Sequence, residues 1–182
     1  MNNEFYSCIQ NALKDFSKNE ENHDVYAIVL DCDSSVGDVV LQYRNRSSFE
    51  SELSTYEEYE NEFGLAVYGL YGSEYEPGEF EIIDYQKTGL VKHFMDSYYY
   101  FQTGCSISDK EPINDIKDSC TNIFRDMVVS TINRLKPEIK NPGIHTTDNF
   151  IIFHCDHDRT YECRDKMIGM TVDKKIMEDL IK

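Results

Sequence analysis

Helical and strand-like segments alternate along this 182-residue chain, and their order constrains the fold more than any single motif does. Four segments repeat apolar residues every three or four positions, which predicts amphipathic helices. These segments are residues 4–18, 48–63, 90–101 and 114–135. Five runs rich in β-branched and aromatic residues predict strands. The runs are residues 25–32, 39–43, 65–71, 80–85 and 149–155.

A short helix after Thr171 completes the order α, ββ, α, ββ, αα, β, α. Strands that follow one another directly tend to pair as hairpins, and helices pack on the resulting sheet. The order therefore predicts one α+β domain over residues 1–182, with a mainly antiparallel sheet of about five strands. Ser47 or Ser48 is expected to cap the second helix, and Pro137 to end the long one.

Composition narrows the expected location of the protein. No apolar run approaches the length of a membrane span, and the first residues lack a basic start followed by an apolar block. The six cysteines are scattered, which argues against a disulfide framework. We therefore expect a cytoplasmic protein without membrane contact.

Residues 47–86 contain eleven carboxylates and no Lys, Arg or His. The whole chain has a formal net charge of -16, so most of the excess lies in this stretch. Concentrated negative charge repels nucleic acid and attracts basic proteins. Six tyrosines lie among the acids, and tyrosine rings suit protein interfaces. The stretch is either a surface that binds a basic partner or a solvated face that keeps the protein soluble.

The residues predicted to bind this partner come from the second half of the acidic helix and from the segment after it. They are Glu57, Glu58, Glu60, Glu62, Tyr71, Glu74, Tyr75, Glu76 and Glu79. Tyr71 and Tyr75 fall at a strand end and in a turn, so we expect both rings to be exposed. Tyr56 and Tyr59 lie on the helical stripe and are either core residues or anchors.

Candidate catalytic and metal-binding groups are weak, and we predict no catalytic residues, cofactor or metal. Residues 31–37 resemble the start of a calcium loop, but the glycine is one position late and Gln42 replaces the bidentate glutamate. His154, Cys155, His157 and Cys163 have metal-ligand chemistry, yet a strand would point neighbouring side chains to opposite faces. A small enzyme using Cys105, with His93 or His145, or using the 154–163 cluster is the alternative.

The layout resembles the domain-of-unknown-function 4303 family of small, mostly bacterial proteins. The resemblance rests on the run 25–31, the acidic aromatic segment 70–76, the long helix 115–135 and the strand 150–154. This chain lacks the tryptophan usual in the family's acidic segment. Such families resemble immunity proteins of bacterial polymorphic toxins. The resemblance implies a non-catalytic protein that blocks a basic, nuclease-like toxin; a DNA mimic that inhibits a nuclease or restriction-type system is the alternative.

Overall fold

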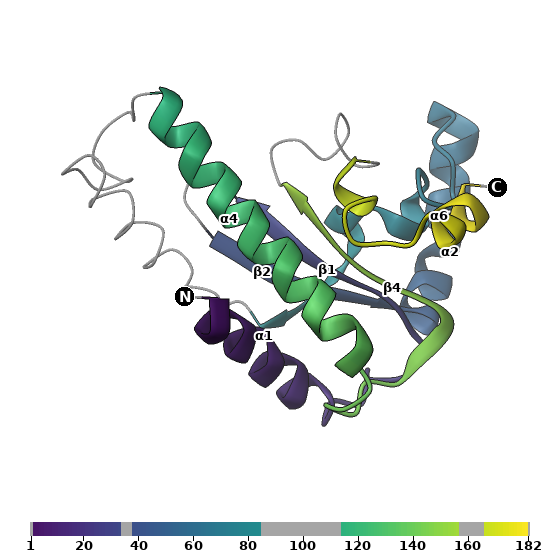
Figure 1. Ribbon diagram of the computed structural model, residues 1–182. Coiled ribbons are helices and arrows are strands. Elements are labelled where there is room, and N and C mark those ends of the chain that lie inside the picture. The colour runs from purple at the N-terminus through teal and green to yellow at the C-terminus, as the bar shows by residue number, and fades with distance from the viewer. Residues whose placement is uncertain (1, 34–37, 85–113, 157–165, 182) are drawn as a thin grey trace.

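The chain folds around a mixed β-sheet with helices on both faces, as the computed structural model in Figure 1 shows. The structure describes residues 2–33, 38–84, 114–156 and 166–181. The α-helices that lie wholly within these ranges are α1 (Asn2–Phe16), α2 (Arg46–Phe63), α4 (Asn114–Leu135) and α6 (Lys174–Leu180). The strands are β1 (Val25–Asp33), β2 (Asp38–Asn45), β3 (Glu81–Asp84) and β4 (Thr146–Asp156). The predicted helix over 90–101 lies outside the described residues.

The sheet has the order β3-β2-β1-β4. β1 pairs with β2, and β2 with β3, in antiparallel orientation, whereas β4 runs parallel to β1. The α+β prediction is confirmed, but the described sheet has four strands and is mixed. The physical reason is the long connection through α4, since parallel neighbours need a crossover and cannot be joined by a tight turn.

β1 forms the centre of two hydrophobic cores. Ile28 and Leu30 point to the face covered by α1 and α4, while Ala27 and Val29 pack in the second core with Phe153. This alternation is the two-residue period of a strand with both faces buried. The apolar stripes predicted for α1 and for the second half of α4 are buried against the first core. The second core lies under α2 and α6 (Figure 1).

The segment over residues 65–71 is irregular, so the strand predicted there is wrong. Gly69 has φ +79, and a Cβ at Gly72 would approach the Val67 and Tyr68 carbonyls within 2.7 Å. These glycines form a tight turn in which the Gly72 amide donates to the Gly69 carbonyl at 2.9 Å. Val67 and Leu70 point inward, while Tyr68 stays exposed. The buried side chains of this segment are therefore three residues apart, and not two apart as in a strand.

The start of α2 is fixed by Asn45 and not by the predicted Ser47 or Ser48. The Asn45 side-chain oxygen accepts from the Ser48 amide at 2.8 Å, which satisfies one of the free donors of the first turn. The Asn45 side-chain amide donates to the Glu21 carbonyl at 3.0 Å. This second contact ties the helix start to the loop before β1, a role that a serine is too short to fill.

The predicted absence of a membrane span agrees with the helices that the structure describes, since none of them is both long and apolar enough to cross a bilayer.

Candidate protein-binding surface

The second half of α2 extends beyond the core. Phe49 and Tyr56 are buried, but every residue of the helix after Tyr56, from 57 to 63, is exposed. The helix ends at Gly64, which has φ +70 and whose amide donates to the Glu60 carbonyl at 2.9 Å. In Figure 1 this end of α2 projects past the sheet. The tertiary fold therefore holds the base of the helix and leaves its last two turns available to a partner.

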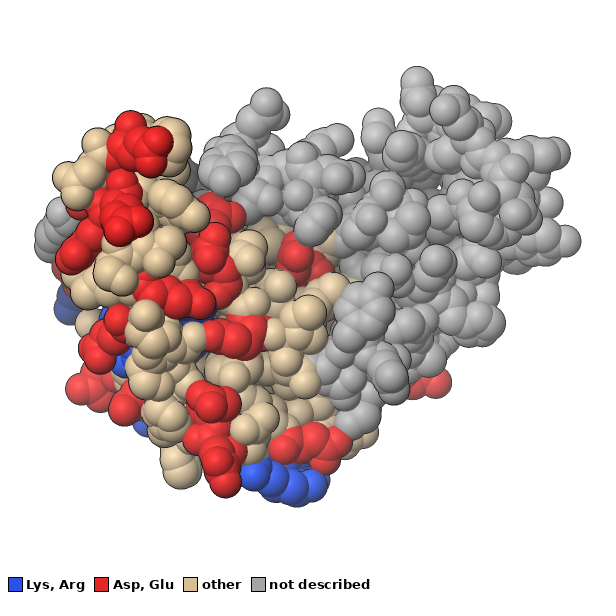
Figure 2. Space-filling model, turned by 180° about the vertical axis from the view of Figure 1, so that it is seen from behind, with Lys and Arg blue, Asp and Glu red and all other residues tan. Residues whose placement is uncertain are grey.

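The projecting turns carry four carboxylates, which we call the acidic ridge: Glu57, Glu58, Glu60 and Glu62. Within the described part of the chain these carboxylates form no ion pair. The last turn of α2 also contains no basic residue. Figure 2 shows that carboxylates far outnumber Lys and Arg on the face where α2 lies. The ridge therefore has an unneutralised negative potential.

The same region exposes large apolar side chains, which we call the aromatic patch: Tyr59, Phe63, Leu65, Tyr68 and Tyr71. Their exposed fractions range from 43% for Tyr59 to 62% for Phe63. Phe63 lies 6.2 Å from the Tyr59 ring, and Tyr68 stands edge-on to Phe49 at 5.9 Å. Tyr71 is exposed, as predicted, whereas Tyr56 belongs to the core and Tyr59 to the patch.

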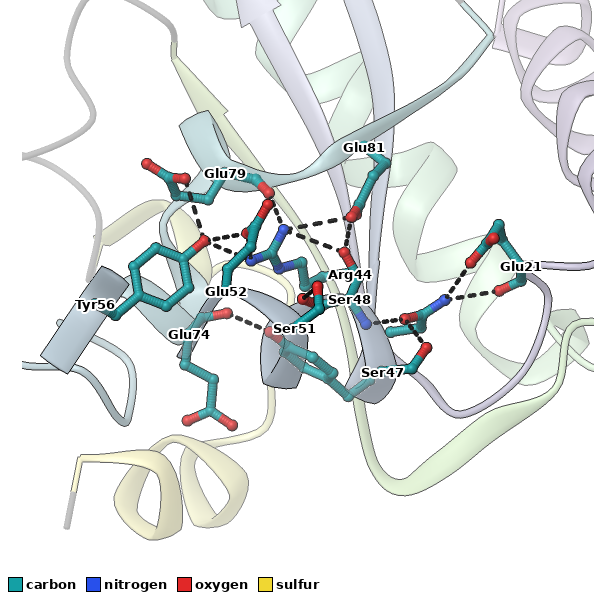
Figure 3. Close-up of polar contacts among 12 residues, drawn as sticks. Glu21, Arg44, Ser47, Ser48, Ser51, Glu52, Tyr56, Glu74, Glu79 and Glu81 are labelled. Carbon is teal, nitrogen blue, oxygen red and sulfur yellow. Dashed lines mark hydrogen bonds and ion pairs between the residues drawn. The ribbon is translucent and has the colours of Figure 1, made fainter. Parts of the chain in front are cut away.

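Other acids of the 47–86 stretch turn inward around Arg44, a fully buried residue of β2 (Figure 3). Its Nη2 donates to Glu52 Oε2 and to the Tyr56 hydroxyl, each at 2.6 Å. Its Nη1 donates to the Glu79 carbonyl and lies 3.4 Å from Glu81 Oε1. One buried guanidinium therefore joins β2, α2 and the segment leading into β3, and it neutralises part of the local negative charge.

The Arg44 network shifts the pKa values of its members in opposite directions. Burial alone would lower the pKa of Arg44, but its bond to Glu52 and the nearby carboxylates raise that pKa above its ordinary value. The pKa of Glu52 is lowered by the Tyr56 hydroxyl and then by Arg44. Desolvation raises the pKa of Glu81. Glu52 therefore keeps its negative charge to lower pH than a free glutamate does, whereas Glu81 takes up a proton more readily.

Glu74 and Tyr75 are buried, so the prediction that they form part of an exposed surface is wrong. Glu74 pairs with Arg46, and its Oε2 accepts from the Gly69 amide at 2.9 Å. The Tyr75 ring is 0% exposed and packs edge-on against Tyr26 at 5.3 Å. The cause is a 3-10 turn at Ser73–Tyr75 that folds these side chains under the loop.

The two remaining predicted contact residues differ in exposure. Glu79 is exposed, and its carboxylate lies 3.2 Å from the Tyr56 hydroxyl. Glu76 is half-buried. The structure thus brings the acidic ridge, Tyr71 and Glu79 to the surface as predicted. It also exposes Phe63, Leu65 and Tyr68, which are not among the predicted contact residues. The strand predicted over residues 65–71 gives no indication that Leu65 and Tyr68 are exposed.

The described residues give little support to the alternative catalytic and metal sites. His154 and Cys155 are buried on β4, and the Cys155 thiol donates to Asp31 Oδ1 at 3.3 Å. Burial raises the pKa of this thiol, which disfavours the reactive thiolate. Among the described residues no group of three or more His, Cys, Asp or Glu is placed to hold a metal ion. Cys105, His93, His157, Cys163 and the turn 34–37 lie outside them.

Replacing Glu81 with glutamine should flatten the pH dependence of stability. Because the pKa of Glu81 is raised in the fold, the native state holds its proton more tightly than the unfolded chain does. The contribution of Glu81 to the free energy of unfolding therefore falls as the pH rises above 4.5, the ordinary value, through the folded pKa. Urea titrations of both proteins across this window should show the smaller decline in Glu81→Gln. Equal declines would contradict the assignment.

No protein-family model and no curated protein matches the chain, and no solved structure matches its fold. The resemblance to the domain-of-unknown-function 4303 family therefore stays a prediction.

Proposed function

We propose that this protein is a non-catalytic immunity protein that neutralises a basic toxin domain by covering its active or substrate-binding surface. The observation that carries the proposal is the acidic ridge: four exposed carboxylates, on two helical turns without a buried residue, that form no ion pair with another described residue. Such a surface is complementary to a cationic protein, whose approach it accelerates. Nuclease-like toxins have such basic faces because they bind phosphates.

The position of the ridge supports a binding role over a purely solubilising one. Glu60 and Glu62 lie in the last turn of α2, where the helix dipole disfavours negative charge by about 0.3–1 kcal/mol each. Glu58 and Glu62 are also like charges at i,i+4, which weakens the helix further. Carboxylates placed elsewhere on the surface would keep the protein in solution without this loss. Folding does not explain why these carboxylates lie at the end of α2, whereas binding of a cationic partner that neutralises them does.

The second candidate, a DNA mimic that inhibits a nuclease or restriction-type system, uses the same charge complementarity. It differs in the partner, which would be a host or defence enzyme and not a toxin. The described residues favour neither partner by themselves. The family resemblance is what places the toxin first.

The proposal is tested by purifying the tagged full chain from its native cell and identifying the bound protein. That protein is then produced alone. We expect a basic domain whose toxicity in a test cell is abolished by co-expression of this chain. The association rate constant should fall at least about tenfold between roughly 50 and 500 mM salt, because exposed charges are screened. A partner with an acidic binding face, or association insensitive to salt, would contradict the proposal.

A further inference from the structure

We infer that the aromatic patch is the anchor site for an apolar segment of the basic partner, and that this segment is bordered by Lys or Arg. The inference rests on the proposed function and extends it. The acidic ridge would speed association with the partner, and the aromatic patch would slow its dissociation.

Exposed apolar side chains concentrate in one stretch of the chain, the last turns of α2 and the loop that follows them. Seven large hydrophobic residues of the described ranges are strongly exposed, and five of them form the patch. A sixth, Ile181, follows Leu180, whose carbonyl accepts from the Leu70 amide at 2.9 Å. Ile181 is therefore next to the loop that carries Tyr68 and Tyr71. Scattered apolar residues are ordinary on a protein surface, whereas a cluster rimmed by charge is typical of an interaction site.

The loop that carries the patch is held in place by the fold. The Ser73 and Glu74 amides donate to the Ala66 and Val67 carbonyls at 3.0 and 2.9 Å, and Val67 is buried beneath. At Gly69, an added Cβ would meet the Leu180 carbonyl at 2.6 Å, so the two segments approach closely. A surface fixed before binding loses less entropy on association, which favours a long-lived complex.

Charge decides which occupant fits the patch. Tyr59 and Phe63 alternate along α2 with the carboxylates of the ridge, so any molecule covering the rings also approaches these acids. A second copy of this chain would bring two unneutralised ridges together, and an anionic lipid surface would be repelled. A segment with an apolar side chain flanked by cations satisfies both the rings and the carboxylates. It would also gain cation–π contacts with the tyrosines.

The test compares two variants in binding kinetics with the partner domain purified above. Phe63→Ser/Leu65→Ser/Tyr68→Ser removes three side chains that are each more than half exposed. Ile82→Ser is the control, since Ile82 is equally exposed but lies on β3, outside the patch. We expect the triple variant to dissociate at least about tenfold faster with an association rate within about threefold of the original, and the control to match the original.

Three other results would overturn the inference. An unchanged dissociation rate in the triple variant, with salt-dependent association intact, would reject the patch and leave the proposed function standing. Equal acceleration by Ile82→Ser would show a general effect of losing surface apolar area. Sedimentation of the free chain is expected to show a monomer, and a dimer that the triple variant dissociates would assign the patch to self-association. Failure of the original chain to bind any basic protein would reject the proposed function itself.

Discussion

The triple reversal Glu57→Lys/Glu58→Lys/Glu60→Lys is expected to lower the association rate constant with the basic partner by about 10- to 100-fold at low salt. Each substitution replaces a negative by a positive charge on the same two helical turns, so the local potential changes sign. The dissociation rate should change much less, since long-range steering acts on the encounter and the aromatic patch is left intact.

Folding should tolerate the reversal. The three side chains are exposed and make no ion pair within the described residues, so no native contact is removed. A lysine at position 60 would also interact favourably with the helix dipole. We therefore expect the free energy of unfolding to stay equal or to rise by a few tenths of a kcal/mol, roughly, in urea titrations.

A matched control separates local from global charge. Glu20→Lys/Asp126→Lys/Asp148→Lys makes the same change in net charge at exposed positions outside α2. It should slow association far less than the ridge variant at equal ionic strength. If both variants slow association alike, net charge governs the encounter and the acidic ridge is not the docking surface.

Arg44→Met is expected to lower the free energy of unfolding by about 3–5 kcal/mol, enough to leave a large part of a marginally stable domain unfolded. The guanidinium is fully buried and pairs with Glu52 and Glu81. Without it, the Glu79 carbonyl loses the guanidinium donor and Glu81 loses its cation in a partly desolvated site. Removing one partner of such a network is far more harmful than the net value of the intact network suggests.

Urea unfolding at neutral pH measures this effect, with Arg125→Met as the control. Among the residues that the structure describes, Arg125 pairs only with its neighbour Asp126, and both side chains are well exposed to solvent, so its loss should change stability by less than about 1 kcal/mol. Arg44→Met/Glu52→Gln/Glu81→Gln should recover part of the loss, because no carboxylate is then left beside an empty cation position. Equal stability of the single and triple variants would show that packing, not charge, is the main role of Arg44.

Much of the architecture is readable from local patterns. The stripe of α1, the end of α4 before Pro137 and the runs that form β1 and β2 depend on neighbours in the sequence, and the structure confirms them. The parallel placement of β4 depends on the path of a long connection, which periodicity does not encode. The irregular segment at 65–71 depends on Gly69 and Gly72, which form a tight turn although the residues around them favour a strand.

The sequence predicts only part of the candidate surface. Density of charge along the chain predicts a negative region, but it does not say which acids meet a cation from another element. Arg44 and Arg46 lie just before the acidic stretch, yet they pair with Glu52, Glu74 and Glu81, at separations of 8 to 37 positions. An arginine that directly follows a predicted strand and precedes a run of acids is the signal in the sequence that suggests a buried pair.

The position of β1 between the two cores has a thermodynamic consequence. Alternate side chains of β1 belong to both cores, so neither core can stay folded when this strand unfolds. We therefore expect the described domain to unfold in a single cooperative step. A destabilising substitution in the core beneath α1 would then also destabilise the packing of α2, although the two helices lie on opposite sides of the sheet. The distal turns of α2 stand outside this coupling, so their residues can change to suit a new partner with little consequence for the integrity of the whole.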